Sequence, residues 1–158
     1  MRRNDREITD RQEILDILRK CDVVRLGINT PDHPYIMPMN FGVEAEGSSL
    51  TLWFHCAPEG SKLDLIRKNP RVGLEADCSH NFIPGEKACC YTMEYESVIG
   101  CGNISICDDK ESKLRGLTAV MRHYAPDETF TFSDTELAVV CVLRLDVTQV
   151  TGKHLKRV

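Results

Sequence analysis

The sequence lacks long apolar runs and any excess of positive charge. No stretch approaches the roughly 18 apolar residues that a membrane-spanning helix needs, and the N-terminal residues lead into no apolar signal region. The 20 basic side chains and 24 acidic ones give a formal net charge of −4, which disfavours general binding to nucleic acid. We therefore expect a cytoplasmic protein without a membrane or nucleic-acid partner.

The sequence also lacks the short motifs of several enzyme classes. It contains no glycine-rich phosphate loop of the Walker or Rossmann kind, no nucleophile elbow and no His-Glu-x-x-His helix. Repeats, low-complexity runs and linkers are absent too, and the apolar share of 42% is ordinary for a globular protein. The 158 residues are therefore expected to form a single domain that spans positions 1–158.

Cysteine, in contrast, is abundant. The chain has eight cysteines but no export signal, so we expect reduced thiols rather than a secreted disulfide framework. The tightest group is Cys78, His80, Cys89 and Cys90, whose spacing is not that of a zinc ribbon or finger. We expect no metal site there, and a metal-binding, cysteine-rich redox protein is the alternative interpretation of this group.

Apolar periodicity predicts three helices. The first opens at a capping box over residues 9–12, and the second begins near Ser61 and ends at Asn69-Pro70. The third opens at residues 108–111 and ends before Pro126. Its apolar positions are Leu114, Leu117, Met121 and Tyr124.

Alternation of apolar and polar residues predicts about six strands. They are expected over residues 24–28, 35–43, 50–54, 72–76, about 91–106 and 138–150. Pro38 predicts a bulge or a free edge in the second strand, and a polar loop is expected from Cys78 to about Ala88. The helices do not alternate with the strands, so a doubly wound parallel sheet fits poorly. We predict a mainly β (α+β) fold, a closed antiparallel barrel with peripheral helices.

Two segments carry side chains suited to ligand binding. Residues 54–62 place His55, Ser61 and Lys62 around a glycine at the entry of the second helix, where free amides and the helix dipole favour an anion such as phosphate. A capped helix with a solvated lysine is the simpler alternative. Residues 35–42 form a proline-interrupted strand that can offer backbone groups to an imide edge, and an ordinary core strand is its alternative.

Four stretches of the sequence together resemble a known family. The first is Met1-Arg2-Arg3 with Asp5-Arg6-Glu7-Ile8, and the second is Pro34-Tyr35-Ile36-Met37-Pro38-Met39-Asn40-Phe41-Gly42. The third is Phe54-His55-Cys56-Ala57 with Glu59-Gly60 and Lys62, and it runs on to Asn69-Pro70-Arg71-Val72. The fourth is Tyr95-Glu96-Ser97-Val98-Ile99-Gly100 with Gly102. In this order they resemble the FMN-binding split-barrel family related to pyridoxamine 5′-phosphate oxidase, and within it the 5-nitroimidazole resistance (Nim-type) proteins.

The resemblance implies a homodimer of split β-barrels that binds FMN in the cleft between subunits. It places Met37, Pro38, Met39 and Asn40 along the isoalloxazine ring, His55, Cys56 and Ala57 near the flavin and its ribityl chain, Ser61 and Lys62 on the phosphate, and Ser97 and Val98 as further contacts. His55 is the residue that the resemblance implies for catalysis or substrate positioning.

The implied function is that of an FMN-dependent oxidoreductase, a nitroimidazole or other nitroaromatic reductase. A non-catalytic flavin- or haem-binding module is the alternative. Oxidation of pyridoxamine phosphate is not expected, because the oxidase has an arginine immediately before the phosphate lysine where this chain has Ser61. The C-terminal substrate-binding segment of the oxidase also has no counterpart here.

Overall fold

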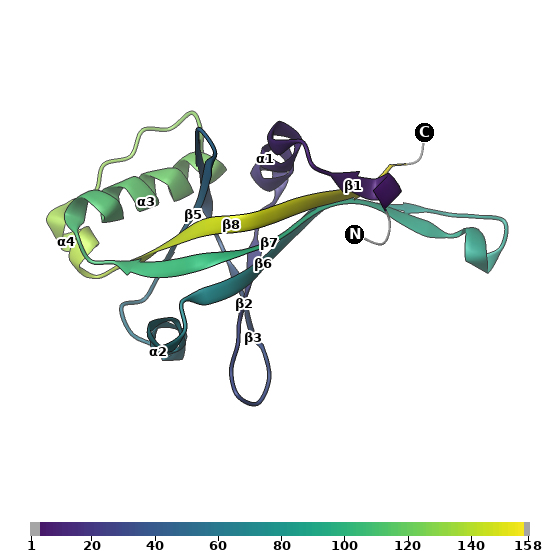
Figure 1. The fold of residues 1–158 in the computed structure, drawn as a ribbon. Helices are drawn as coiled ribbons and strands as arrows, with labels where there is room; N and C mark the ends of the chain where they lie inside the picture. The colour runs from purple at the N-terminus through teal and green to yellow at the C-terminus, as the bar shows by residue number, and fades with distance from the viewer. Residues whose placement is uncertain (1–3, 157–158) are drawn as a thin grey trace.

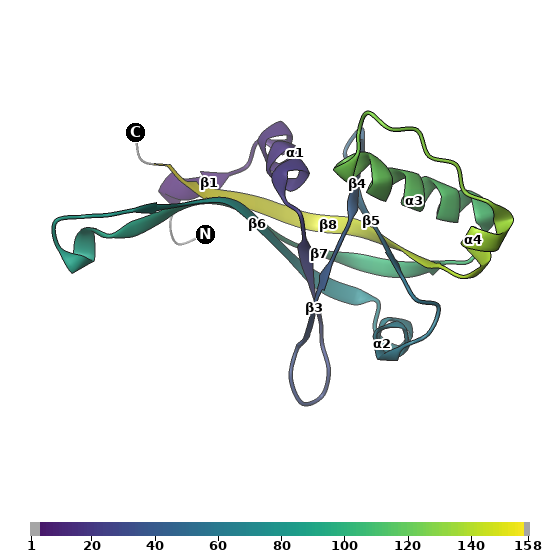
Figure 2. The ribbon, with the colours of Figure 1, turned by 180° about the vertical axis from the view of Figure 1, so that it is seen from behind.

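The structure, a computed structural model, describes residues 4–156 and is built around one antiparallel sheet (Figures 1 and 2). The strands are β1 (Glu7–Ile8), β2 (Val24–Ile28), β3 (Tyr35–Met39), β4 (Gly42–Glu46), β5 (Ser49–Cys56), β6 (Arg71–Ile83), β7 (Thr92–Cys107) and β8 (Cys141–Leu155). The helices are α1 (Arg11–Lys20), α2 (Ser61–Lys68), α3 (Lys110–Tyr124) and α4 (Asp134–Ala138), with 3-10 turns η1 (Asn4–Arg6) and η2 (Ala88–Cys90).

The sheet is split rather than closed. Its strand order is β3-β2-β6-β7-β8-β5-β4, with β1 paired to β8, so the consecutive strands β3 and β4 form opposite ends of the hydrogen-bonded path. The chain joins these two ends, but no ladder between them is present in residues 4–156. The mainly β fold and the split barrel are therefore confirmed, whereas the fully closed barrel predicted from strand alternation is wrong.

The second predicted strand is interrupted at its middle. The apolar alternation continues from Tyr35 to Val43, but the chain turns at Asn40 and Phe41 and passes from β3 to β4. Pro38 pairs with Arg25 in a regular register with no bulge, and β3 has only β2 as a neighbour. Of the two alternatives for Pro38, the free edge is the one that the structure contains.

Most of the predicted polar loop after Cys78 is strand. β6 continues to Ile83 and pairs with β7, and the two form a long hairpin that projects from the rest of the molecule in both views. A bulge between Cys78 and Asn81, with Ser79 at a φ of 58°, shifts the register at the base of this hairpin. We call residues 79–94 the arm.

Side-chain caps explain where most helices begin. The Asp10 carboxylate accepts a hydrogen bond from Glu13 N at 2.8 Å, so Asp10 rather than Thr9 caps α1. Asp109 caps α3 in the same way through Ser112 N. A capping box at Ser133 opens α4. The sequence predicts no helix there and begins its last strand at residue 138, where α4 ends.

The packing of α3 forms a second core beside the main one. The Trp53 side chain is 1% exposed and lies beneath α3 with Leu117, Val120 and Val142. Gly116 allows this approach, because a Cβ there would stand 2.7 Å from the Trp53 ring. The buried stripe of α3 therefore runs through 116, 117 and 120, and of the predicted apolar positions only Leu117 is fully buried.

The helices of residues 4–156 are also too short or too polar to cross a lipid bilayer.

Candidate functional site

The two segments singled out in the sequence lie against each other. Lys62, in the first turn of α2, places its Nζ 4.0 Å from the Sδ of Met39 at the end of β3. Met37 and Met39 turn their side chains into the core, while Ile36 and Pro38 are exposed on the other face of this edge strand. The structure therefore brings the edge of β3 and the start of α2 to one surface.

The N-terminus of α2 has no side-chain cap. Gly60 occupies the cap position with a φ of 141°, a conformation that glycine adopts readily, and it contributes only its backbone carbonyl to Leu63 N. The amides of Ser61 and Lys62 consequently have no partner within the helix. Since α1, α3 and α4 all carry an Asp or Ser cap, α2 is the helix whose amides are left for water or a ligand.

Among residues 4–156 no carboxylate neutralises the charge of Lys62. Its polar contact there is the Met39 thioether, whereas Lys20 and Lys156 both pair with Glu96. The side chain is half-buried, and its ammonium lies against Met39, on the same surface as the first turn of α2. Positive charge and unpaired amides together make this surface suited to an anion.

The end of β5 approaches the same helix through a short connection. His55 is exposed and lies opposite Val142 of β8, and Cys56 is half-buried opposite Cys141. Ala57 begins the exposed segment 57–60 that leads to Ser61. The predicted residues of β5 and α2 are thus consecutive along one rim of the sheet.

Tyr124 fixes the corner that follows β3, a role that the sequence reading missed. Its hydroxyl donates to Asp22 O at 2.6 Å and accepts hydrogen bonds from Phe41 N at 3.1 Å and Asn40 Nδ2 at 3.2 Å. The sequence predicts Tyr124 only as an apolar position of the third helix. The hydroxyl of a tyrosine at a helix end is the one sequence feature that could have suggested such a contact.

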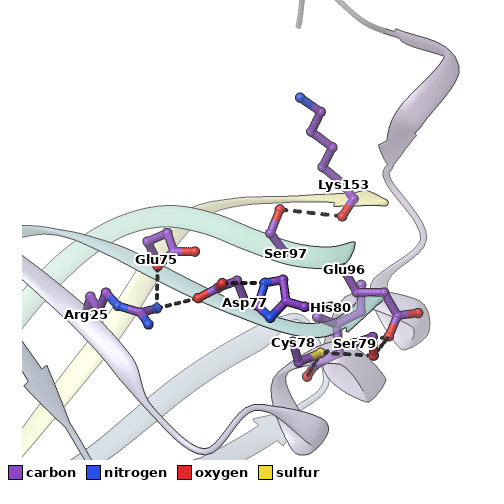
Figure 3. A network of polar contacts seen from close by, with 10 residues as sticks. Arg25, Glu75, Asp77, Cys78, Ser79, His80, Glu96, Ser97 and Lys153 are labelled. Carbon is purple, nitrogen blue, oxygen red and sulfur yellow. Dashed lines mark hydrogen bonds and ion pairs between the residues drawn. The ribbon is translucent and has the colours of Figure 1, made fainter. Parts of the chain in front are cut away.

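Ser97 and Val98 lie on β7, where they pair with Asp77 and Ala76 of β6. The Ser97 hydroxyl donates to Lys153 O at 3.5 Å (Figure 3). The Val98 side chain is fully buried in the core. Contact of either residue with a flavin stays a prediction.

The cysteine and histidine group near the arm does not assemble into a metal centre. His80 Nε2 lies 2.7 Å from Asp77 Oδ2, and Cys78 faces Glu96 (Figure 3). Cys89 and Cys90 are exposed on η2. Across residues 4–156 no three His, Cys, Asp or Glu side chains are placed to hold a metal ion together. The geometry therefore does not support the metal-binding alternative.

Glu96 is a buried carboxylate held by several donors at the base of the arm. It is 3% exposed and accepts hydrogen bonds from Lys20, Lys156 and Ser79 at 2.9, 2.7 and 2.8 Å. Burial raises the pKa of Glu96, but the hydrogen bonds from Lys156, Lys20 and Ser79 outweigh it and lower that pKa to about 2. This network ties α1, the arm and the end of β8 together.

A separate groove of about 710 Å³ lies between α3 and β4. Its walls include Arg19, Arg122 and the Arg115–Glu44 ion pair, with Leu114 among the apolar residues. None of the residues predicted for the site lines this groove. The predicted residues therefore form an open surface at the rim of the sheet rather than part of that hollow.

Comparison with known proteins identifies relatives over nearly the whole chain. The model of the pyridoxamine 5′-phosphate oxidase family matches residues 10–154. A crystal structure from Bacteroides thetaiotaomicron, described as a candidate 5-nitroimidazole antibiotic resistance protein, is 34% identical, with 94% of this chain and 86% of that chain covered and a TM-score of 0.81. No curated protein matches the sequence.

More distant structures share the fold. A flavocytochrome from Azotobacter vinelandii is 15% identical, covers 99% of this chain and 72% of its own, and has a TM-score of 0.82. A protein from Mycobacterium smegmatis that binds FAD and heme is 16% identical, covers 96% of this chain and 74% of its own, and also has a TM-score of 0.82. At these identities the likeness establishes the architecture alone.

Proposed function

This chain belongs to the pyridoxamine 5′-phosphate oxidase family, and we propose that it is an FMN-dependent oxidoreductase that reduces nitroaromatic compounds such as 5-nitroimidazoles. The observation that carries the proposal is the contact between Lys62 and Met39, which brings the uncapped start of α2 against β3, the strand at one end of the sheet. The description of the Bacteroides relative supports the choice of substrate class.

The residues present fit a flavin that carries a phosphate. Ser61 and Lys62 would bind the phosphate with two unpaired amides and one ammonium group, because α2 lacks a side-chain cap. The free edge of β3, from Met37 to Asn40, would offer backbone groups to the polar edge of the ring. Bound FMN would supply electron transfer between a reductant and the substrate.

Two features support a site shared between two copies of the chain. The predicted residues lie on an open rim, so a single protomer would leave much of a flavin exposed. The arm also carries exposed apolar side chains at Phe82, Tyr91 and Met93, which a second copy would cover. In such a dimer Ser97 would come from the partner or lie outside the site.

His55 and Cys56 would line the approach to the ring from the end of β5. The exposed imidazole of His55 can donate a hydrogen bond to a nitro oxygen or deliver a proton during reduction. Cys56 and Ala57 would contact the ribityl side of the cofactor. In this arrangement the protein binds and orients both molecules and excludes water, and His55 is the group proposed to move a proton.

Anaerobic turnover with a chemical reductant and a 5-nitroimidazole tests the proposed activity. We expect amine product from the wild-type protein and a rate about 100-fold lower for His55→Gln, the usual size of general acid catalysis. His33→Gln, which changes an exposed histidine in the β2–β3 turn, serves as the matched control and should retain the rate. If bound flavin is reduced but no nitro compound is consumed, the non-catalytic binding module is the correct function.

A further inference from the structure

We propose that Cys56 and Cys141 form a redox-active thiol pair that converts reversibly to a cross-strand disulfide. The two residues are the last of β5 and the first of β8, and they lie directly opposite each other in an antiparallel ladder. Opposed residues in such ladders have Cα atoms about 4.5–5.5 Å apart, within the roughly 4.4–6.8 Å that disulfides span. The bridge therefore requires no rearrangement of the sheet.

One thiol of the pair is accessible to a small oxidant and the other is buried. Cys56 is half-buried and can be reached by a small molecule, whereas Cys141 is 6% exposed and belongs to the main core. Burial and the adjacent Cys56 thiol raise the pKa of Cys141 to about 11. Cys56 is accordingly the thiol that attacks an oxidant, and Cys141 is the thiol that resolves the intermediate.

Two neighbouring cations partly offset the effect of burial on Cys141, whose pKa is nevertheless raised. Lys113 and Arg67 both act to lower the pKa of Cys141, against the effect of burial. Lys113 is fixed beside the start of β8, since its Nζ donates to Leu137 O at 2.9 Å and to Val140 O at 3.1 Å. Reactive cysteines occur in electropositive, partly exposed surroundings of this kind.

A second thiol pair in the same chain provides an internal comparison. Cys21 lies against Cys78, and burial followed by the Cys78 thiol, Asp77 and Glu75 raises the pKa of Cys21 well above its ordinary value. Cys78 itself lies 3.9 Å from the Glu96 carboxylate. The carboxylates near this pair raise the pKa of Cys21, whereas the cations near the other pair act to lower that of Cys141, so Cys56 and Cys141 should oxidise first.

The chemistry needs only a low-molecular-weight disulfide as the oxidant. The Cys56 thiolate attacks one sulfur of that disulfide, forming a mixed disulfide and releasing one small thiol. The Cys141 thiol then loses its proton to solvent and attacks Cys56 Sγ, which forms the protein disulfide and releases the second small thiol. The protein loses two electrons and two protons in total, and the oxidant is reduced to two thiols.

The position of the pair gives oxidation a structural consequence. Cys56 precedes the segment 57–60 that leads into α2, so a bridge to Cys141 would tether the chain where it leaves the sheet for Ser61. Disulfides that form transiently in reducing compartments are typically catalytic or redox-sensing. The inference that the two thiols can pair rests on the register of β5 and β8 and does not depend on FMN binding.

Equilibration in glutathione redox buffers, followed by thiol alkylation and peptide mass mapping, tests this inference. In the wild-type chain we expect a Cys56–Cys141 disulfide at glutathione ratios that leave Cys21 and Cys78 reduced. In Cys141→Ala, which removes the resolving thiol, Cys56 should instead retain one covalently bound glutathione. Cys78→Ser is the matched control, and it should form the Cys56–Cys141 bridge as the wild type does.

Two results would overturn the inference. One is that Cys56 and Cys141 stay as free thiols under conditions that already join Cys21 to Cys78. The other is a stable mixed disulfide on Cys56 in the wild-type chain, because this would mean that Cys141 does not resolve it. Both can be scored on the same peptide map, on which the exposed Cys89 and Cys90 are followed separately.

Discussion

Lysine side chains at the rim of the sheet and at the base of the arm differ in their charged partners. Within residues 4–156 no carboxylate pairs with Lys62, whereas Lys20 and Lys156 neutralise the buried Glu96. The sequence predicts an anion site at Lys62 and Ser61 because the signals for a helix start and an anion site are local. It could not pair Cys56 with Cys141, since that contact depends on the register of strands far apart in the chain.

Glu96 makes stability depend on pH in the acid range. The pKa of this carboxyl is lowered to about 2 in the folded protein, so its stabilising contribution is complete above its ordinary pKa of 4.5 and is lost as the pH falls toward 2. We expect Glu96→Gln to cost about 1.5–3 kcal/mol at pH 7, the value of hydrogen bonds to a charged group, and much less at pH 3.

Urea denaturation at the two pH values measures this difference. Glu59→Gln, in the exposed segment before α2, is the control and should change the free energy of unfolding little at either pH. A loss for Glu96→Gln that is equally large at pH 3 and pH 7 would contradict the assigned role of the carboxylate.

At the scale of elements, α3 positions the corner between β3 and β4. The helix lies on the sheet (Figure 1), and the hydroxyl of its final residue, Tyr124, accepts a hydrogen bond from Phe41 N in the corner and donates one to Asp22 O before β2. The sequence predicted α1, α2, α3 and most strands from periodicity but not α4, and it joined β3 to β4 because the apolar alternation passes through the turn unchanged. It missed the β6 side of the arm because both faces there are exposed, which removes the apolar–polar alternation.

Removal of the Tyr124 hydroxyl should loosen this corner. Tyr124→Phe leaves the partly buried amide of Phe41 without its acceptor, and we expect the free energy of unfolding to fall by about 1–3 kcal/mol. Chemical denaturation with Tyr91→Phe as the matched control, a tyrosine exposed on the arm, isolates the effect of the hydroxyl. Equal stability of the two variants would show that the hydroxyl does not hold the corner.

At the scale of the whole molecule, the split in the sheet leaves β3 with a free edge and brings the start of α2 to it. The family and the split-barrel architecture follow from motifs spread along the chain, and the comparisons confirm both. The resemblance implies a homodimer, but the exposed apolar side chains of the arm could not be placed from the sequence, because the segment of β6 that carries Phe82 was predicted to be a polar loop. The proposed dimer places this apolar surface and the open rim under a second chain.

Titration of FMN into the purified protein, with sedimentation analysis of the complex, tests the central claim most directly. We predict a dimer that binds one FMN for each chain, as two-fold symmetry requires. Lys62→Ala should weaken FMN binding by about 10- to 150-fold, equivalent to about 1.5–3 kcal/mol, while Lys68→Ala at the other end of α2 should leave it unchanged. A monomer, or wild-type affinity in Lys62→Ala, would contradict the account.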